Sequence, residues 1–335
     1  MQEEEEKMPM TPEEFRKSLR GVVHLVMTPF DENDEVDENS LRRSVKHVSN
    51  ALRGEEAVFL VTGSTAEFYA MTDEENKKVI RVVVEELNGE FPVLAGTGRG
   101  GTRLTIQMSQ AAQELGANGV LVVNPYYHLV TEEGLYRHYK QVAENIDIGI
   151  VIYNNAVTSK LWISPELMAR LSKIPNIVGD KENTSNIAAY YLMQRAVDPE
   201  DMTMITGVGQ LFYPFEVLFR SKGYVTELAN FAPEIAVELH RAAKSKNIDK
   251  MTELMDKRIS PYHLFLSRCA KRHGKIPTVL SPHIAIDELP IYQSACKSAM
   301  NLIGLSVGRA REPMENITAE EKEKLRGVLK QIGVL

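Results

Sequence analysis

Two residues that can do covalent chemistry end two runs of apolar, β-branched sequence. Lys181 ends the run 176–181, and Tyr153 ends the run 149–153, 28 residues upstream. A lysine at the point where a strand leaves the core is partly desolvated, which favours its neutral, nucleophilic amine. Taken singly, a surface lysine and a core tyrosine are the simpler interpretations. Together, at the ends of neighbouring strands, they indicate a site for carbonyl chemistry through a Schiff base.

Composition and charge limit the classes of partner. The 335 residues are 43% hydrophobic and 25% charged, which is ordinary for a soluble globular protein. The net charge of −7 leaves no electrostatic footprint for nucleic acid. No apolar stretch reaches the length of a membrane span, and the acidic start lacks the apolar segment of a signal peptide. We therefore expect a cytoplasmic protein that binds neither nucleic acid nor membrane.

The cysteines and histidines give no sign of a metal site or a disulfide framework. The only two cysteines, Cys269 and Cys296, are isolated from one another and from any CxxC or Cys/His cluster. We expect two free thiols and no bound metal.

Alternating strand-like and helical segments predict a (β/α)8 TIM barrel. The eight strand-like runs are 22–27, 57–62, 92–96, 119–124, 148–153, 177–181, 202–206 and 224–229. A doubly wound sheet is the alternative, but residues 28–30 after the first run do not form its usual glycine-rich phosphate loop. We expect an acidic N-terminal extension at 1–18, a catalytic barrel at 19–232 and a helical C-terminal appendage at 233–335, which serves packing or oligomerisation.

The order and spacing of several strand-end motifs resemble the dihydrodipicolinate synthase/N-acetylneuraminate lyase family. The resemblance covers roughly residues 19–243. The motifs are Gly63-Ser64-Thr65-Ala66-Glu67, Ala95-Gly96-Thr97-Gly98, Pro125-Tyr126-Tyr127, Tyr153-Asn154 and Ile177-Val178-Gly179-Asp180-Lys181-Glu182. It implies class I aldolase-type chemistry that needs no metal or organic cofactor, but it leaves the substrate open.

The resemblance also implies a role for each matched residue. Lys181 would condense with the keto carbon of a 2-oxo acid such as pyruvate, and Tyr153 would shuttle protons at the imine. Ser64 and Thr65 would hold the substrate carboxylate through hydroxyl and backbone N–H groups. Tyr127 matches an aromatic residue that reaches into a neighbouring subunit's site, so a homo-oligomer, either a dimer or a tetramer, is expected.

The chain departs from the family in the loop after the fifth predicted strand. Thr158 stands where the synthases carry an arginine that binds the dicarboxylic partner of their reaction. Lys160 supplies a charge nearby but not the bidentate geometry of a guanidinium. This departure speaks against the synthase reaction.

Glu227 is a second departure, in the eighth predicted strand. If Val225 faces the barrel, as the family match implies, alternation makes Glu227 face it too. A carboxylate there is costly unless it is paired or functional. We expect Glu227 to contact a hydroxylated substrate or to transfer protons, together with Asn155; a structural ion pair is the alternative. Asn155, Thr206, Val225 and Glu227 join Ser64 and Thr65 as the predicted substrate-binding residues.

These features favour a Schiff-base-forming lyase that acts on a 2-oxo acid, either a pyruvate-type aldolase or a dehydratase or aldolase of keto-deoxy sugar acids. One alternative is 4-hydroxy-tetrahydrodipicolinate synthase activity, which condenses pyruvate with aspartate semialdehyde. A non-catalytic protein that binds 2-oxo acids is the alternative from another class.

Overall fold

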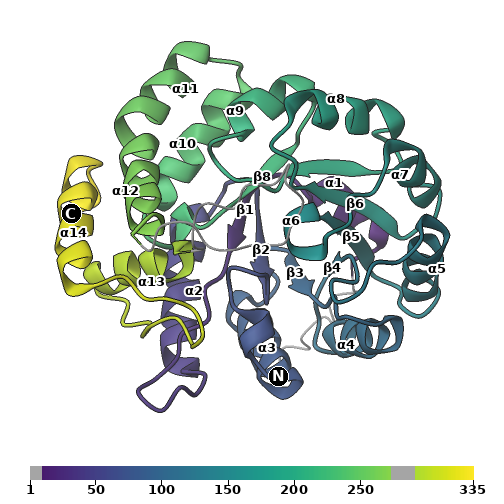
Figure 1. Ribbon diagram of the computed structural model, residues 1–335, viewed down its shortest axis with the longest axis horizontal. Helices are drawn as coiled ribbons and strands as arrows, with labels where there is room; N and C mark the ends of the chain where they lie inside the picture. The colour runs from purple at the N-terminus through teal and green to yellow at the C-terminus, as the bar shows by residue number, and fades with distance from the viewer. Residues whose placement is uncertain (1–9, 273–290) are drawn as a thin grey trace, which may run out of the picture.

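The computed structural model describes residues 10–272 and 291–335, so parts of the predicted N-terminal extension and C-terminal appendage lie outside it (Figure 1). Eight parallel strands, buried along their whole length, close into a barrel in chain order. They are β1 Gly21–Leu25, β2 Ala57–Val61, β3 Val93–Gly96, β4 Gly119–Val123, β5 Gly149–Asn154, β6 Ile177–Glu182, β7 Thr203–Thr206 and β8 Gly223–Thr226. The predicted (β/α)8 barrel is confirmed.

Helices surround the barrel between successive strands (Figure 1). Local capping explains where several of them begin: Thr72 and Glu75 form a reciprocal capping box at the start of α3, and Ser164 caps α7 ahead of Pro165. The surrounding helices are α2 Glu38–Leu52, α3 Asp73–Leu87, α4 Thr102–Glu114, α5 Glu132–Ala143, α6 Ala156–Ser159, α7 Pro165–Leu171, α8 Ile187–Ala196 and α9 Tyr213–Glu216. Single-turn 3₁₀ helices η1 Phe68–Ala70, η2 Val217–Phe219 and η3 Leu228–Asn230 lie in the loops.

The register between strands decides which side chains share the barrel interior. Lys181 of β6 pairs with Tyr153 of β5 on one side and with Ile205 of β7 on the other. Paired residues point to the same face of a sheet and successive residues to opposite faces. Asp180 and Glu182 therefore point outward, toward the helices.

Helix α1, Pro12–Ser18, packs across the N-terminal ends of the strands, although the sequence placed these residues in an extension. Phe15 is fully buried there. A methyl group added at Gly119 or Gly149, the first residues of β4 and β5, would lie 2.3 or 2.6 Å from the Phe15 ring. Glycine at these positions makes room for Phe15 to close this end of the barrel.

The described part of the C-terminal appendage is helical, as predicted, and it lies on one side of the barrel, where α14 packs against α12 and α13 (Figure 1). Its elements are α10 Pro233–Lys244, α11 Ile248–Leu254, the π-helical turn η4 Met255–Ile259, α12 Ser260–Ala270, α13 Tyr292–Leu302 and α14 Ala319–Gln331. Helix α13 also contacts η3, which directly follows β8, so the appendage reaches the C-terminal end of the barrel. Within the described residues, every helix is too short or too polar to span a bilayer.

Candidate active site

Lys181 and Tyr153 meet inside the C-terminal end of the barrel. Lys181 is only 4% exposed, and its Nζ lies 3.7 Å from the centroid of the Tyr153 ring. The paired positions of the two residues on β5 and β6 produce this contact. The structure thus brings together the amine and the phenol on which the Schiff-base prediction depends.

Asn155 fixes the phenol of Tyr153. Its Nδ2 donates a hydrogen bond of 2.8 Å to Tyr153 Oη. Its Oδ1 accepts from the backbone N–H groups of Val157 and Thr158 at the start of α6, which sets the orientation of the amide. Because the phenol oxygen already accepts a hydrogen bond, its own hydrogen is left for a substrate atom. Asn155 therefore contributes to the site by orienting the Tyr153 phenol.

The turn after β2 presents unused donors. The N–H groups of Ala66, Glu67 and Phe68 close this turn onto the carbonyls of Gly63 and Ser64. Among the described contacts, by contrast, the backbone N–H and hydroxyl groups of Ser64 and Thr65 have no partner. Ser64 and Tyr153 line one small cavity. Adjacent free backbone N–H groups form a concave site for an anion.

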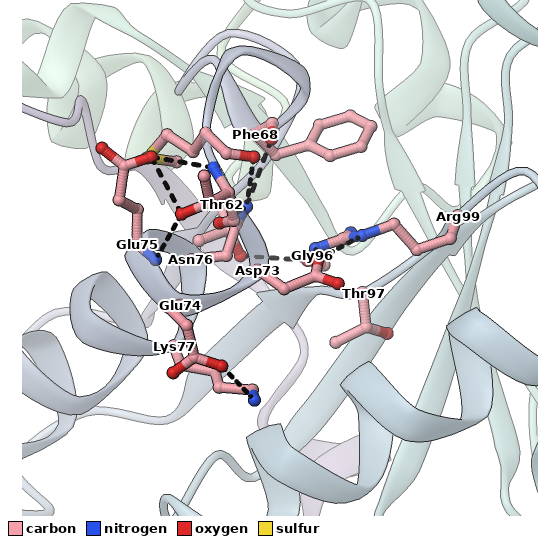
Figure 2. A network of polar contacts seen from close by, with 12 residues as sticks. Thr62, Phe68, Asp73, Glu74, Glu75, Asn76, Lys77, Gly96, Thr97 and Arg99 are labelled. Atoms are coloured by element: carbon pink, nitrogen blue, oxygen red, sulfur yellow. Dashed lines mark hydrogen bonds and ion pairs between the residues drawn. The ribbon is translucent and has the colours of Figure 1, made fainter.

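The segment that follows this turn is held in place from two sides (Figure 2). Asn76 of α3 donates through Nδ2 to the carbonyls of Phe68 and Thr72, at 3.2 and 2.9 Å. From the loop after β3, Arg99 bonds Asp73 at 2.9 Å and lies over the Phe68 ring. The segment that follows the donors of Ser64 and Thr65 is therefore anchored to α3 and to the loop after β3.

Glu227 lies at the end of β8 but not in it, which corrects the predicted strand. The strand ends at Thr226, and Glu227 precedes η3 with its side chain half-buried. Gln210, in the loop after β7, donates to Glu227 Oε1 at 3.1 Å. Strand alternation therefore does not set the direction of the Glu227 side chain, because the strand ends one residue before it. Val225 pairs with Val23 of β1, is 5% exposed, and lies in the predicted register.

Gln210 links Glu227 to the C-terminal appendage. Its Nε2 also lies 2.7 Å from His263 Nε2 on α12, and its Oε1 accepts from the Thr226 hydroxyl. Since a carboxylate oxygen of Glu227 accepts, the group of Gln210 that faces it is the amide NH2, and the amide oxygen faces the Thr226 hydroxyl. The amide then donates to both partners, so His263 Nε2 is an acceptor. Burial lowers the pKa of His263, while Glu227 opposes this shift.

Of the predicted site residues, Ser64 and Tyr153 line the small cavity, whereas Thr206 and Tyr127 do not face the barrel interior. Thr206 pairs with the outward-facing Glu182, is fully buried, and bonds Ser221 at 2.9 Å, so it lies on the helix-facing side of β7. Tyr127, in the loop after β4, is 73% exposed and has its ring against His128. Thr206 was predicted to bind substrate, but its register is opposite to that of Lys181.

The geometry agrees with comparisons to known proteins. The sequence model described as the Dihydrodipicolinate synthetase family matches residues 18–332. The chain belongs to this family. A relative from Methanopyrus kandleri, named 4-hydroxy-tetrahydrodipicolinate synthase, is 31% identical over 95% of this chain and 97% of its own length. A relative of the same name from Kosmotoga olearia is 32% identical over 95% of this chain and 99% of its own length.

Solved structures of the family share the fold. The dihydrodipicolinate synthase from Aquifex aeolicus superposes with a TM-score of 0.78 at 30% identity, over 94% of this chain and 98% of that chain. A chloride-inhibited dihydrodipicolinate synthase from Acinetobacter baumannii, complexed with pyruvate, gives a TM-score of 0.81 at 28% identity, over 95% of this chain and 100% of that chain. This member of the family is accordingly an enzyme of the lyase type.

Within this family member, the loop that departs from the synthases folds as α6. Thr158 Oγ1 lies 3.4 Å from the Asn155 carbonyl, and Lys160 donates to the Tyr127 carbonyl at 3.2 Å. Lys160 therefore ties two loops at the mouth of the barrel. In the part of the chain that the structure describes, no group of three or more His, Cys, Asp or Glu side chains is arranged to hold a metal.

Sequence reasoning missed four residues near the site, namely Gln210, His263, Tyr292 and Lys297. Tyr292, at the start of α13, is close enough to Tyr153, Tyr69 and Glu227 to interact with them electrostatically. Three of the four belong to the C-terminal appendage, where no local pattern in the sequence marks them. Only Gln210 has a position along the chain that points to the site, because it lies in the loop that follows the C-terminal end of β7.

Proposed function

We propose that this enzyme forms a Schiff base between Lys181 and a 2-oxo acid and cleaves or dehydrates that acid. The contact between Lys181 Nζ and the Tyr153 ring, at 3.7 Å, carries the proposal. It places a buried amine beside a phenol whose position is fixed by Asn155. The free donors of Ser64, in the cavity that Tyr153 also lines, provide a place for the substrate carboxylate.

Each proposed step uses these groups. The neutral amine of Lys181 attacks the keto carbon, and the carbonyl oxygen leaves as water after Tyr153 delivers a proton to it. In cleavage, the iminium accepts the electron pair of the bond between the third and fourth carbons, while the hydroxyl on the fourth carbon loses its proton and becomes the carbonyl of the released aldehyde; the third carbon is then reprotonated. In dehydration, the third carbon loses a proton to the medium through the site, and the hydroxyl on the fourth carbon then leaves as water. Attack of water on the iminium releases the keto product and regenerates Lys181. Ser64 and Thr65 hold the carboxylate throughout.

Two features favour a hydroxylated substrate, such as a keto-deoxy sugar acid, over a dicarboxylic partner. Thr158 cannot form the bidentate contact that a guanidinium makes with a second carboxylate. Glu227 adds a carboxylate near the mouth of the barrel, held by Gln210. A carboxylate accepts hydrogen bonds from substrate hydroxyl groups and repels a substrate carboxylate. An aldolase or dehydratase of such acids is therefore our first candidate.

Synthase activity is the second candidate, because the two relatives described above both carry the name 4-hydroxy-tetrahydrodipicolinate synthase. Here the enamine formed from pyruvate would attack aspartate semialdehyde instead of arising from cleavage. An assay with pyruvate and aspartate semialdehyde, run beside a panel of keto-deoxy sugar acids, separates the two candidates. Turnover of neither substrate type, with intact adduct formation, would favour a non-catalytic 2-oxo acid binding protein.

We also propose a homo-oligomer, either a dimer or a tetramer. Tyr127, Leu129 and Val130 expose large apolar side chains in one loop at the mouth of the barrel. An apolar cluster of this kind is typical of a contact surface. Sedimentation of the purified protein tests this part of the proposal, and a monomer at micromolar concentration would contradict it.

Reductive trapping tests the central proposal. The protein is treated with pyruvate and sodium borohydride, and the labelled peptide is identified by mass spectrometry. We expect the added mass on Lys181 and none in Lys181→Ala. Lys173→Ala, which removes an exposed lysine that only pairs with Asp201, is the matched control and should label as the wild type does. Labelling at another lysine, or its absence in the wild type, would overturn the proposal.

A further inference from the structure

The turn that carries the free donors contains a residue in an unfavourable backbone conformation. Glu67 has φ 67° and ψ 34°, in the left-handed region, and it precedes η1. A side chain with a Cβ atom enters this region only when its surroundings hold it there. Glu67 is also fully buried. A buried carboxylate needs partners, and these identify what holds the turn.

The partners of Glu67 come from the C-terminal appendage. Lys297 of α13 places its Nζ 2.6 Å from Glu67 Oε1, and the side chains of this pair are 1% and 0% exposed. The backbone N–H of Arg311, 244 residues away along the chain, donates to Glu67 Oε2 at 2.8 Å. Both carboxylate oxygens are therefore engaged by residues outside the barrel.

Lys297 is itself fixed in place. Its Nζ donates to the Arg309 carbonyl at 2.9 Å and lies 4.2 Å from the centroid of the Phe30 ring, in the segment after β1. The guanidinium of Arg311 lies 4.0 Å from the same centroid and also bonds Glu75 of α3 at 2.5 Å. The ion pair thus belongs to a packed cluster that joins the appendage to the loops after β1 and β2.

This cluster has a consequence for the cavity. Glu67 lies two residues from Thr65, and its own N–H bonds the Ser64 carbonyl. A change in the position of Glu67 would therefore change the direction of the Ser64 and Thr65 donors, which are the groups that a substrate carboxylate would contact. Small displacements of a positioning group carry large costs in binding and rate.

We propose that Lys297 is a positioning residue for the substrate carboxylate: through its buried ion pair with Glu67, it holds the Ser64–Thr65 donors in their binding geometry. The C-terminal appendage then takes part in assembling the active site and does not serve packing alone. This inference rests on the proposed function, because it assumes that the turn binds the carboxylate of a 2-oxo acid.

The test compares two ketones that differ in the carboxylate. Pyruvate carries it and hydroxyacetone does not, and both can be trapped on Lys181 with borohydride. In Lys297→Met we expect the concentration of pyruvate that gives half-maximal labelling to rise about tenfold, which corresponds to about 1.4 kcal/mol. Labelling by hydroxyacetone and the maximal labelling by pyruvate should change little. The preference for pyruvate over hydroxyacetone should fall by the same factor.

Two further variants keep the test decisive. Glu67→Gln/Lys297→Met removes both charges and so leaves no unpaired buried charge, which protects folding. Arg272→Met is the control, since it removes ion pairs with Glu321 and Glu315 inside the appendage and leaves both charges of the Glu67–Lys297 pair in place. The control should melt at a lower temperature without any loss of preference for pyruvate.

The outcomes separate this inference from the proposed function. Wild-type protein that is not labelled on Lys181 by pyruvate would remove the proposed function. A second outcome is that pyruvate labels Lys181 in the wild type, but the folded Lys297 variants keep the same preference for pyruvate over hydroxyacetone. This result would overturn only the role of Lys297. Loss of folding in both Lys297 variants, judged by circular dichroism, would make the ion pair a structural element and would also overturn that role.

Discussion

Asn154 Nδ2 donates a hydrogen bond of 2.8 Å to Glu182 Oε2, and these two residues directly follow Tyr153 and Lys181 on their paired strands. The Asn154 carbonyl oxygen Oδ1 also accepts from the backbone of Ile163. On the outer face of the barrel, this contact fastens together the two strand ends whose inner side chains do the proposed chemistry. It explains how a pair of side chains on separate strands keeps a fixed geometry.

Replacing Asn154 by alanine should therefore loosen the contact between Tyr153 and Lys181. We expect turnover to fall about tenfold while pyruvate still labels Lys181, and the free energy of unfolding to fall by about 1–3 kcal/mol because Glu182 loses a buried donor. Asn118→Ala is the control, since it removes a comparable contact to Val93 at the opposite end of the barrel. Equal loss of turnover in both variants would show that the effect is only one of stability.

Tyr153→Phe removes the proposed proton carrier and leaves the ring over Lys181. We expect the adduct with pyruvate to form slowly and turnover to fall by about 10²–10⁴, the usual contribution of general acid–base catalysis. Single-turnover labelling and steady-state rates measure the two effects separately. Asn155→Ala, which frees the phenol from its hydrogen bond, should lie between this variant and the wild type. Unimpaired turnover in Tyr153→Phe would contradict the assigned role.

Glu227→Gln keeps the shape of the side chain and its bond from Gln210 but removes the charge. If the carboxylate contacts a hydroxylated substrate, turnover of keto-deoxy acids should fall about tenfold, while pyruvate labels Lys181 as in the wild type. The measurement is kcat/KM across the substrate panel. Wild-type values on every substrate would return Glu227 to a structural role, in which it anchors Gln210 and His263.

The fold could be predicted because its signals are local. Buried parallel strands read as continuous apolar runs, and caps such as Thr72 and Ser164 mark helix starts within four residues. The signal is weakest in helix α8, where the exposed apolar residues Tyr191 and Leu192 lie next to the buried Tyr190 and Met193 and obscure the helical period.

The site was predictable only where a single strand defines it. Lys181 and Tyr153 follow from the rule that barrel strands carry the chemistry at their C-terminal ends. Thr206 follows the same rule but faces the other way, because facing depends on the register between strands and not on where a strand ends. The partnership of Glu67 with Lys297 depends on how the appendage docks, which no spacing along the chain records.

Glu216 predicts how stability depends on pH. Its side chain is fully buried on the outer side of the barrel beside Thr206, and burial raises its pKa from 4.5 to about 8. Between these values the folded state holds a proton that the unfolded state has released, so the free energy of unfolding falls as pH rises through this window. Burial acts in the same direction on Glu182, whose pKa rises to about 7.

Glu216→Gln removes one of these titrations and should make the decline in stability shallower. We compare the free energy of unfolding at about pH 5 and about pH 8, which roughly span the titration window. Over this range the variant should lose less of this free energy than the wild type does. The difference should be a few kcal/mol, since each unit of pKa shift corresponds to about 1.4 kcal/mol. Urea denaturation across this range measures the difference. Glu166→Gln, at the exposed first turn of α7, is the control and should follow the wild type. Parallel curves for Glu216→Gln and the wild type would show that Glu216 is ionised in the folded protein, because only a group that holds its proton on folding produces the difference.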